Sequence, residues 1–225
     1  GKHGQGTLNI SNGGYVSCRG GGYIGRYSGS TGQVSVDGEG SSWSCGCGYL
    51  IVGYEGQGTL NISNGGNVNV DEDTWVASEE GSTGQINFDN GTLTTGGLLA
   101  ASADLTGTGV INTYGIVSDI DLLFDSTHGT NQTIILDSLP GQNITINLSQ
   151  DSYGPLGAGY ASEGTLTIKD GVSVESYWGY LGYKSGSAGQ AYVDGAGSSW
   201  SCGHNLYVGG SGQGTLEISN GGNVS

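Results

Sequence analysis

Apolar and polar residues alternate along most of the chain in short runs that glycine and asparagine interrupt. Leu8 and Ile10 are separated by one polar residue, and the same spacing recurs at Val34 and Val36. Alternation with a period of two over about five residues, ended by Gly or Asn-Gly, is typical of a β-strand followed by a turn. Helical periodicity is sustained nowhere, so the pattern predicts an all-β fold.

Two phrases recur almost word for word. The first is Gly-x-Gly-Thr-Leu-x-Ile-Ser-Asn-Gly-Gly or a diverged copy of it, found at 4–14, 56–66, 162–171 and 212–222. The second, Gly-Ser-Thr-Gly-Gln-Val-Ser-Val-Asp-Gly and its variants, lies at 29–38, 81–90 and 186–195. The two phrases alternate, so that one unit is about 26 residues long, as in solenoid repeats.

Each unit contains three short apolar runs, which predicts three strands per coil. Coils stacked at the usual strand spacing of about 4.8 Å would place Leu8 over Val34 inside a tube. Asn-Gly and Asp-Gly pairs supply corners with positive φ. We therefore predict a right-handed parallel β-helix (β-solenoid); a β-sandwich is the alternative, but it would not require repeats at one spacing. The expected interior residues are Leu8, Ile10, Val34, Val36, Leu60, Ile62, Ile86, Phe88, Leu166, Ile168, Leu216 and Ile218.

The repeats extend over nearly the whole chain, which predicts a single solenoid domain over 1–225. Regular coils are expected at 1–107 and 161–225, whereas 108–160 lacks both phrases and contains Pro140 and Pro155. We interpret 108–160 as degenerate coils or an insertion, with a protruding hairpin as the alternative. The last coil opens at Gly212 and is incomplete, so we expect a continuing chain or a neighbouring subunit to close it.

Composition and charge exclude several partners. The 48 Gly lack the Gly-X-Y triplet of collagen, and 34% hydrophobic residues is too many for a solvated linker. Five Lys and Arg oppose 20 Asp and Glu, which gives a net charge of −15. Nucleic acid and anionic membrane surfaces need clustered cations and are therefore poor partners. No apolar run is long enough to span a bilayer.

The sequences of the repeats resemble those of a known family. The motifs lie at Gly4–Gly14, Gly22–Gly25, Gly29–Trp43, Gly186–Trp200 and Leu206–Gly209. They resemble the repeat shared by type V secretion (autotransporter) passengers and PEP-CTERM-sorted surface proteins, and Val117–Gly129 is similar to the non-repeat segment of very long members. The resemblance implies a bacterial, exported, β-helical surface or matrix protein, and it implies no catalytic residues.

Right-handed β-helices include polysaccharide lyases and glycosidases, so catalysis is an alternative function. A lyase needs clustered cations, but Lys2, Arg19, Arg26, Lys169 and Lys184 are far apart in the sequence. The acidic groups that could serve a glycosidase are Asp71, Glu72 and Asp73, then Glu79 and Glu80, then Asp119, Asp121 and Asp125. We expect these groups to lie at solvated corners. The prediction is no enzyme and no catalytic residue, with a carbohydrate-active β-helix enzyme as the alternative.

The sequence offers little for a cofactor. The three histidines have no metal-ligand spacing, which argues against zinc. Asp37, Asp89 and Asp194 occupy the same place in their coils, and carboxylates at turns suit Ca²⁺. We expect no cofactor, and calcium at these three residues, in a carbohydrate-binding surface protein, is the open alternative.

Four cysteines allow a sharper prediction. Matching Leu8 to Val34 places Val16 against Trp43 and Cys18 against Cys45, if the second corner has one extra residue. Stacked Cα atoms about 4.8 Å apart are within reach of a disulfide. We predict a Cys18–Cys45 disulfide, with Cys47 as a substitute if the register slips by two, and buried free thiols as the alternative.

Cys202 is equivalent to Cys45, but it is about six coils from the other cysteines. The position after Ser225 corresponds to Cys18. A cysteine there, from a continuing chain or a neighbouring subunit, would pair with Cys202 in the same way.

Together these features predict an extracellular or cell-surface β-solenoid with a structural and adhesive role, as part of a long surface fibre or matrix filament. The expected partners are further coils, through end-to-end self-association or a continuing chain, and a surface polysaccharide. A scaffold without any ligand is a further alternative.

Overall fold

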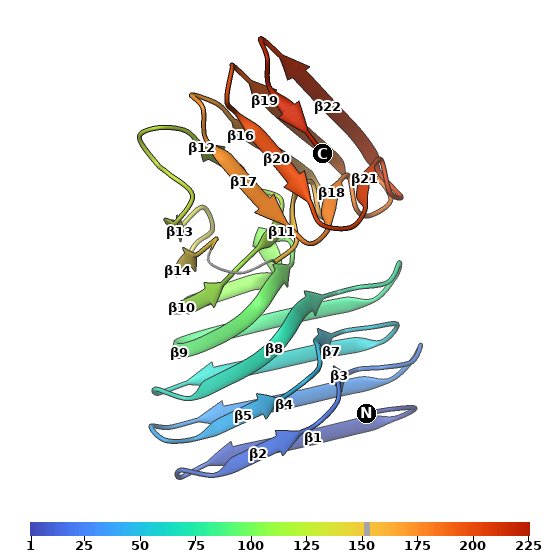
Figure 1. Cartoon of the computed structure of the whole chain (residues 1–225). Helices are drawn as coiled ribbons and strands as arrows, with labels where there is room; N and C mark the ends of the chain where they lie inside the picture. The colour runs from blue at the N-terminus through green and yellow to red at the C-terminus, as the bar shows by residue number, and fades with distance from the viewer. Residues whose placement is uncertain (151–153) are drawn as a thin grey trace. The chain divides into compact units, whose positions relative to one another are not determined.

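Figure 1 shows the computed structural model of the chain, which describes residues 1–150 and 154–225. The described residues are almost entirely β-strand and turn, and the one helix among them is the three-residue 3₁₀ turn Ser102–Asp104. No helix in these residues is long and apolar enough to cross a membrane. The predicted all-β class is therefore confirmed.

The chain divides into two compact units. The first contains Gly1–Gly96, Ala103–Asn112 and Ile134–Asn147. The second contains Gly97–Ser102, Thr113–Thr133 and Leu148–Ser225, with a gap at 151–153. Each unit has its own stack of coils, and the single domain predicted over 1–225 stays a prediction.

The first unit is built from three-strand coils. Its strands are β1 (Gln5–Ser11), β2 (Tyr15–Cys18), β3 (Gly22–Ile24), β4 (Thr31–Asp37), β5 (Ser42–Cys45), β6 (Leu50–Val52), β7 (Gln57–Ser63), β8 (Asn67–Val76), most of β9 (Thr83–Leu99), and nearly all of β10 (Leu105–Thr113) and β14 (Asn143–Leu148). β1, β4, β7 and β9 pair in parallel, and β2, β5 and β8 form the next column. β1 runs behind β2 in Figure 1, and the chain rises from one coil to the next as a right-handed β-helix. The predicted fold class is thus confirmed.

The coil register agrees with the sequence prediction. Leu8 pairs with Val34, and Leu60 pairs with Val34 on one side and Ile86 on the other. Of the twelve expected interior residues, nine are buried: Ile10, Val34, Val36, Leu60, Ile62, Ile86, Phe88, Leu166 and Ile168. The prediction was wrong for Ile218, which is 48% exposed, and Leu8 and Leu216 are only half-buried. Ile218 nevertheless pairs in register with the buried Val193, and its strand β22 has a paired neighbour on one side only.

The second unit repeats the plan. Its strands are β11 (Ile116–Ser118), β12 (Asp121–Phe124), β15 (Leu156–Ala158), β16 (Glu163–Ile168), β17 (Ser173–Ser176), β18 (Gly179–Leu181), β19 (Ala188–Asp194), β20 (Ser199–Cys202), β21 (Leu206–Val208), β22 (Gln213–Ser219) and β23 (Asn223–Val224). The three columns are β12-β16-β19-β22, β17-β20-β23 and β11-β15-β18-β21. Leu122 pairs with Leu166, and Leu166 pairs with Ala191, so the apolar positions stay in register.

The stretch 108–160, which lacks the repeated phrases, is also made of strands. β13 (Gln132–Leu136) pairs with β14, and β14 pairs with β10. β12 pairs in parallel with β16, which begins the next regular coil. Residues 151–153 of this stretch are outside the described residues.

Corners of two lengths join the first strand of a coil to the second. In the short corner, residues 12–14 connect β1 to β2, and Asn12 and Gly13 both have positive φ, 57° and 76°. In the long corner, residues 38–41 connect β4 to β5. Because Ser11 pairs with Asp37 and Tyr15 with Ser42, the extra residue is accommodated in the corner, as predicted.

Candidate functional site

The structure brings Cys18 and Cys45 together. β2 and β5 pair so that Val16 lies opposite Trp43 and Cys18 opposite Cys45, which confirms the predicted register. The two Sγ atoms are 3.3 Å apart, as thiols. A disulfide has a sulfur–sulfur distance of about 2.05 Å. The structure therefore shows the proximity, and the bond stays a prediction.

The environment of Cys45 determines its reactivity. The residue is fully buried. Burial, with a smaller contribution from the hydrogen bond with Cys18, raises the pKa of the Cys45 thiol to about 12. The thiolate is the form that attacks a disulfide or an oxidant-activated sulfur. Cys45 is therefore a poor nucleophile, and Cys18, which is only half-buried, is the better candidate to start the reaction.

We expect peptide mapping of native material without reduction to recover Cys18 and Cys45 in one disulfide-linked peptide pair, with Cys47 alkylated as a free thiol. The reason is that the first two face each other, whereas Cys47 is exposed at the corner, with a φ of 62°. Material reduced before alkylation is the control. Recovery of both Cys18 and Cys45 as free thiols from native material would contradict the prediction.

Cys202 lies opposite Ser176 in the second unit. Its Sγ is 3.5 Å from the Ser176 Oγ, which also accepts a hydrogen bond from the indole Nε1 of Trp200 at 2.9 Å. On the other side, Trp200 pairs with Val224, which makes the position after Ser225 the one opposite Cys202. This register agrees with the prediction, and the disulfide proposed for Cys202 stays a prediction.

The three candidate calcium residues have different surroundings. The Asp37 Oδ1 accepts hydrogen bonds from the Ser63 Oγ at 2.6 Å and the Asn64 Nδ2 at 2.8 Å. The Asp194 Oδ1 accepts equivalent bonds from Ser219 and Asn220. These bonds lower the pKa of both carboxyl groups. Asp89 accepts a hydrogen bond from its neighbour Asn90.

The aspartates at 37 and 194 therefore tie one coil to the next. Among the described residues, no three His, Cys, Asp or Glu side chains lie close enough together to hold a metal ion. Calcium at these positions stays a prediction.

The sequence predicts a solvated corner for the acidic group at 71–73, but the structure places this group in a strand. All three residues belong to the long strand β8, which continues through the place where other coils turn. Asp71 and Glu72 are exposed, but Asp73 is half-buried. Burial, and secondarily the charge of Glu72, raises the pKa of Asp73 to about 6. The continuous strand, which the sequence pattern did not predict, is the reason for this difference.

The other acidic groups have structural contacts. The Asp119 Oδ1 accepts hydrogen bonds from the amides of Ala161 and Ser162. The Asp125 Oδ1 accepts the amides of Thr127 and His128, and it is 2.8 Å from the His128 Nδ1. Asp125 itself is buried, contrary to the expected solvated corner, because these hydrogen bonds satisfy its carboxylate inside the turn.

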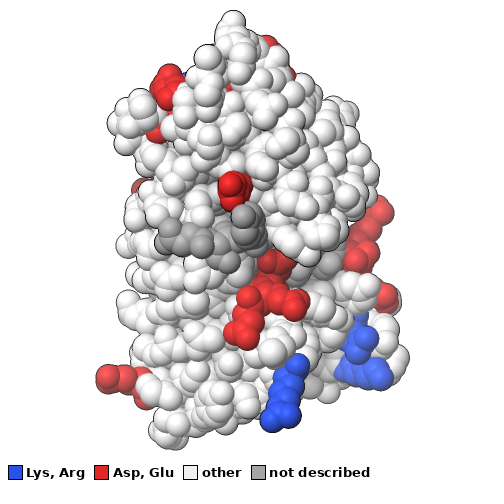
Figure 2. All heavy atoms as spheres, viewed as in Figure 1, with Lys and Arg blue, Asp and Glu red and all other residues white. Residues whose placement is uncertain are grey.

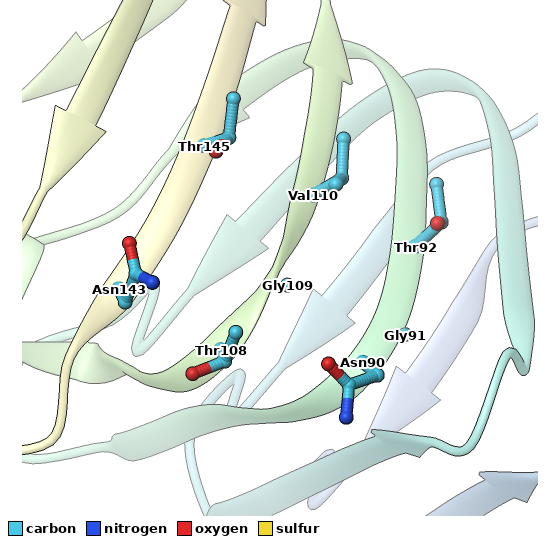
Figure 3. A pocket seen from close by; sticks show the side chains of 8 residues that line it. All are labelled: Asn90, Gly91, Thr92, Thr108, Gly109, Val110, Asn143 and Thr145. Carbon is cyan, nitrogen blue, oxygen red and sulfur yellow. The ribbon is translucent and has the colours of Figure 1, made fainter.

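A groove of about 300 Å³ lies in the first unit, where β9, β10 and β14 run side by side (Figure 3). Its lining has amide and hydroxyl groups and no charged side chain: Asn90, Gly91, Thr92, Thr108, Gly109, Val110, Asn143 and Thr145. A Cβ on Gly91 would be 2.5 Å from the Ile62 carbonyl oxygen, and one on Gly109 would be 2.6 Å from the Phe88 ring. Glycine at these two positions therefore allows the floor of the groove to pack tightly on the core.

Two ladders of hydrogen-bonded polar side chains accompany the groove. Along the first column, Asn61 donates to the Ser35 Oγ at 3.3 Å and Asn87 donates to the Asn61 Oδ1 at 2.8 Å. Thr106 extends this ladder by donating to the Asn87 Oδ1 at 2.6 Å. On the neighbouring face, the Asn112 Nδ2 donates to the Thr94 Oγ1 at 3.4 Å and the Asn147 Nδ2 donates to the Asn112 Oδ1 at 2.9 Å. Sequence reasoning missed the groove because its residues come from three segments, two of them outside the repeated phrases.

The second unit has a column of stacked aromatic rings. The rings of Tyr180 and Tyr207 are 5.4 Å apart with an angle of 10° between their planes, and Trp178 stacks on His204 at 5.1 Å. The rings face one another from coil to coil, and Tyr207 keeps 39% of its surface exposed. Ring stacking of this kind stabilises the contact between coils.

Charged side chains occupy little of the surface in view. Figure 2 shows a face that is mostly uncharged, with acidic and basic side chains in small separate groups. Compared with models of protein families, with curated proteins and with solved structures, the chain has no match.

Proposed function

We propose that this chain is a structural and adhesive element of a bacterial surface fibre or extracellular matrix, and that it binds a neutral polysaccharide. The observation that carries the proposal is the groove, together with the ladders that continue from coil to coil beside it. A stack of in-register coils is rigid along its axis and repeats its outer surface at each step. Such a surface suits a ligand that itself consists of repeated units.

The chemistry of the groove favours sugars without charge. Asn and Thr side chains supply both donors and acceptors, and sugar hydroxyl groups need both. The net charge of −15 would repel an anionic polysaccharide, since only five basic residues oppose it. A neutral polysaccharide is therefore the ligand class that fits.

The extracellular location in this proposal rests on the wording of the repeats, which resembles the repeat of exported bacterial surface proteins. The facing Cys18 and Cys45 agree with that location, because disulfides persist in oxidising compartments.

We expect the chain to sediment with insoluble neutral polysaccharides such as β-glucan, mannan or chitin. Replacing Thr108 and Asn143 together by Ala should weaken binding about thirtyfold, since two net hydrogen bonds contribute about 1 kcal/mol each. Gln33→Ala, at an exposed position of β4 away from the groove, is the matched control. Equal binding by the groove variant and the control would contradict the proposal.

The same assay separates the alternatives. Binding that disappears after EDTA treatment would favour a calcium-dependent protein, with Asp37, Asp89 and Asp194 as the first residues to replace. Shortened or unsaturated sugar products that no longer form after Asp71→Asn or Asp73→Asn would favour a carbohydrate-active enzyme. We expect neither result.

A further inference from the structure

The short and long corners differ in the groups that they present to the coil on either side. The long corner contains one additional residue, Ser41 in the first unit and Ser198 in the second, and both serines are buried. The Ser41 Oγ accepts a hydrogen bond from the amide of Gly13 in the short corner before it, at 3.1 Å. Ser198 accepts the amide of Gly171 in the same way, at 3.0 Å. The long corner therefore satisfies a backbone donor of the short corner that precedes it.

On its other side, the long corner presents a carboxylate. Asp37 accepts hydrogen bonds from Ser63 and Asn64 in the next short corner. Asp194 accepts the equivalent bonds from Ser219 and Asn220. The same set of contacts thus occurs in both units: the carboxylate belongs to the last strand residue before the long corner, and the donors are the last strand residue before the next short corner and the first residue of that corner.

Neighbours of the same type could not make these bonds. If a short corner followed a short corner, Gly14 would occupy the place of Ser41 and Ser11 the place of Asp37, as the strand register shows. The corner amide would lose its hydroxyl acceptor, and the Ser and Asn donors would lose their carboxylate. If a long corner followed a long corner, two carboxylates would lie opposite each other at the strand spacing of about 4.8 Å, where like charges repel.

One short corner has a different neighbour, which shows what the corner requires. The corner after β7 lies against β9, where a bulge replaces the long corner. There the carbonyl oxygens of Asp89 and Asn90 accept the amides of Asn64 and Gly65. The neighbour again supplies acceptors to the corner amides, although it does so with its backbone.

We propose that the short and long corners form a recognition pair, and that the open edge made by β22 and β23 binds a long-corner coil in preference to a second short-corner coil. At this edge the amide of Gly221 occupies the place that Gly13 and Gly171 have in the other short corners. A coil with a short corner such as residues 12–14 is therefore a poor partner for this edge. The inference rests on the proposed role in a fibre and specifies the kind of coil that its stacking requires.

Two extended chains of equal length test the pairing directly. Both begin after Ser225 with a copy of residues 18–30, which completes the coil that β22 opens. One continues with a copy of residues 31–56, which carries the long corner, and the other with a copy of residues 5–30, which carries the short corner. Under reducing conditions, we expect hydrogen exchange in the peptide Gln213–Ser225 to be at least about tenfold slower with the long-corner extension than with the short-corner extension.

Ser41→Ala within the copied long corner should remove most of this difference. Equal protection by the two extensions, or stronger protection by the short-corner extension, would overturn the proposal.

Substitutions within the parent chain keep the test independent of whether the extensions fold. Ser41→Ala should accelerate exchange at Gly13, and Asp37→Ala should accelerate it in 64–66, by about tenfold in each case. Asp89→Ala is the control, because Asp89 is the extra residue of the bulge in β9 and its carboxylate accepts its side-chain hydrogen bond from adjacent Asn90. If the first two variants exchange like the control, the corners do not recognise each other.

The parent chain provides a last check that separates this inference from the proposed function. If exchange slows with rising protein concentration in both Gln5–Ser11 and Gln213–Ser219, two short-corner edges are meeting. That result would overturn the corner pairing and would still support a fibre. If the chain binds no polysaccharide but hydrogen exchange behaves as expected above, only the adhesive role is contradicted.

Discussion

Leu60→Asp is expected to unfold the first unit. Leu60 is fully buried and lies between Val34 and Ile86 in the first column of strands. An unpaired carboxylate at this position costs several kcal/mol, whether it is buried as the ion or shifts its pKa and becomes protonated. Domains are stable by about 5–15 kcal/mol in total, so this single change removes a large part of the free energy of unfolding.

Circular dichroism during thermal and urea unfolding measures the effect. Gln33→Asp is the matched control, because it adds the same charge at an exposed, outward-facing position of the adjacent strand β4. We expect the control to unfold within about 0.5 kcal/mol of the parent chain, as surface substitutions usually do. If Leu60→Asp melts at the temperature of the control, the inward orientation of this column is wrong.

Asp73→Asn is expected to stabilise the chain at neutral pH. The pKa of Asp73 is raised to about 6, mainly by burial. For an acid whose folded pKa is above its unfolded value, the folded state binds the proton more tightly than the unfolded state does. The contribution of Asp73 to stability is therefore highest below about pH 4, falls as the pH rises from 4 to 6, and is then constant. A shift of about two units corresponds to roughly 2–3 kcal/mol, which Asn, an uncharged residue of the same size, should recover above pH 6.

Urea unfolding at several pH values between 4 and 8 tests this prediction. The variant should gain stability over the parent chain as the pH rises and should match it near pH 4. Glu72→Gln should give a smaller gain, because the Glu72 charge is the secondary cause of the raised pKa. Asp71→Asn, at an exposed position of the same strand, is the control. A constant difference between Asp73→Asn and the parent at all pH values would contradict the assigned cause.

Much of the fold follows from the sequence because parallel coils stack in register. In such a stack, residues one repeat apart in the sequence become neighbours in space, so the spacing between repeats predicts which residues lie opposite each other. Leu8 over Val34 and Cys18 opposite Cys45 could both be predicted in this way, including the extra residue in the long corner. The Asn-Gly corners could be predicted equally well, since few residues adopt positive φ without strain.

Only the tertiary structure decided the features in which coils depart from the repeat or contact one another through side chains. The groove needs β9, β10 and β14 to lie side by side, although β14 is separated from β10 by about thirty residues that carry neither phrase. Asp73 is partly shielded from solvent because β8 continues where other coils turn, and no local pattern predicts that continuation. Asp37 accepts hydrogen bonds from Ser63 and Asn64 of the next coil, which the sequence pattern did not predict. The sequence determines the repeat and its register because both depend on spacing, whereas burial and hydrogen-bond partners depend on how the coils pack in three dimensions.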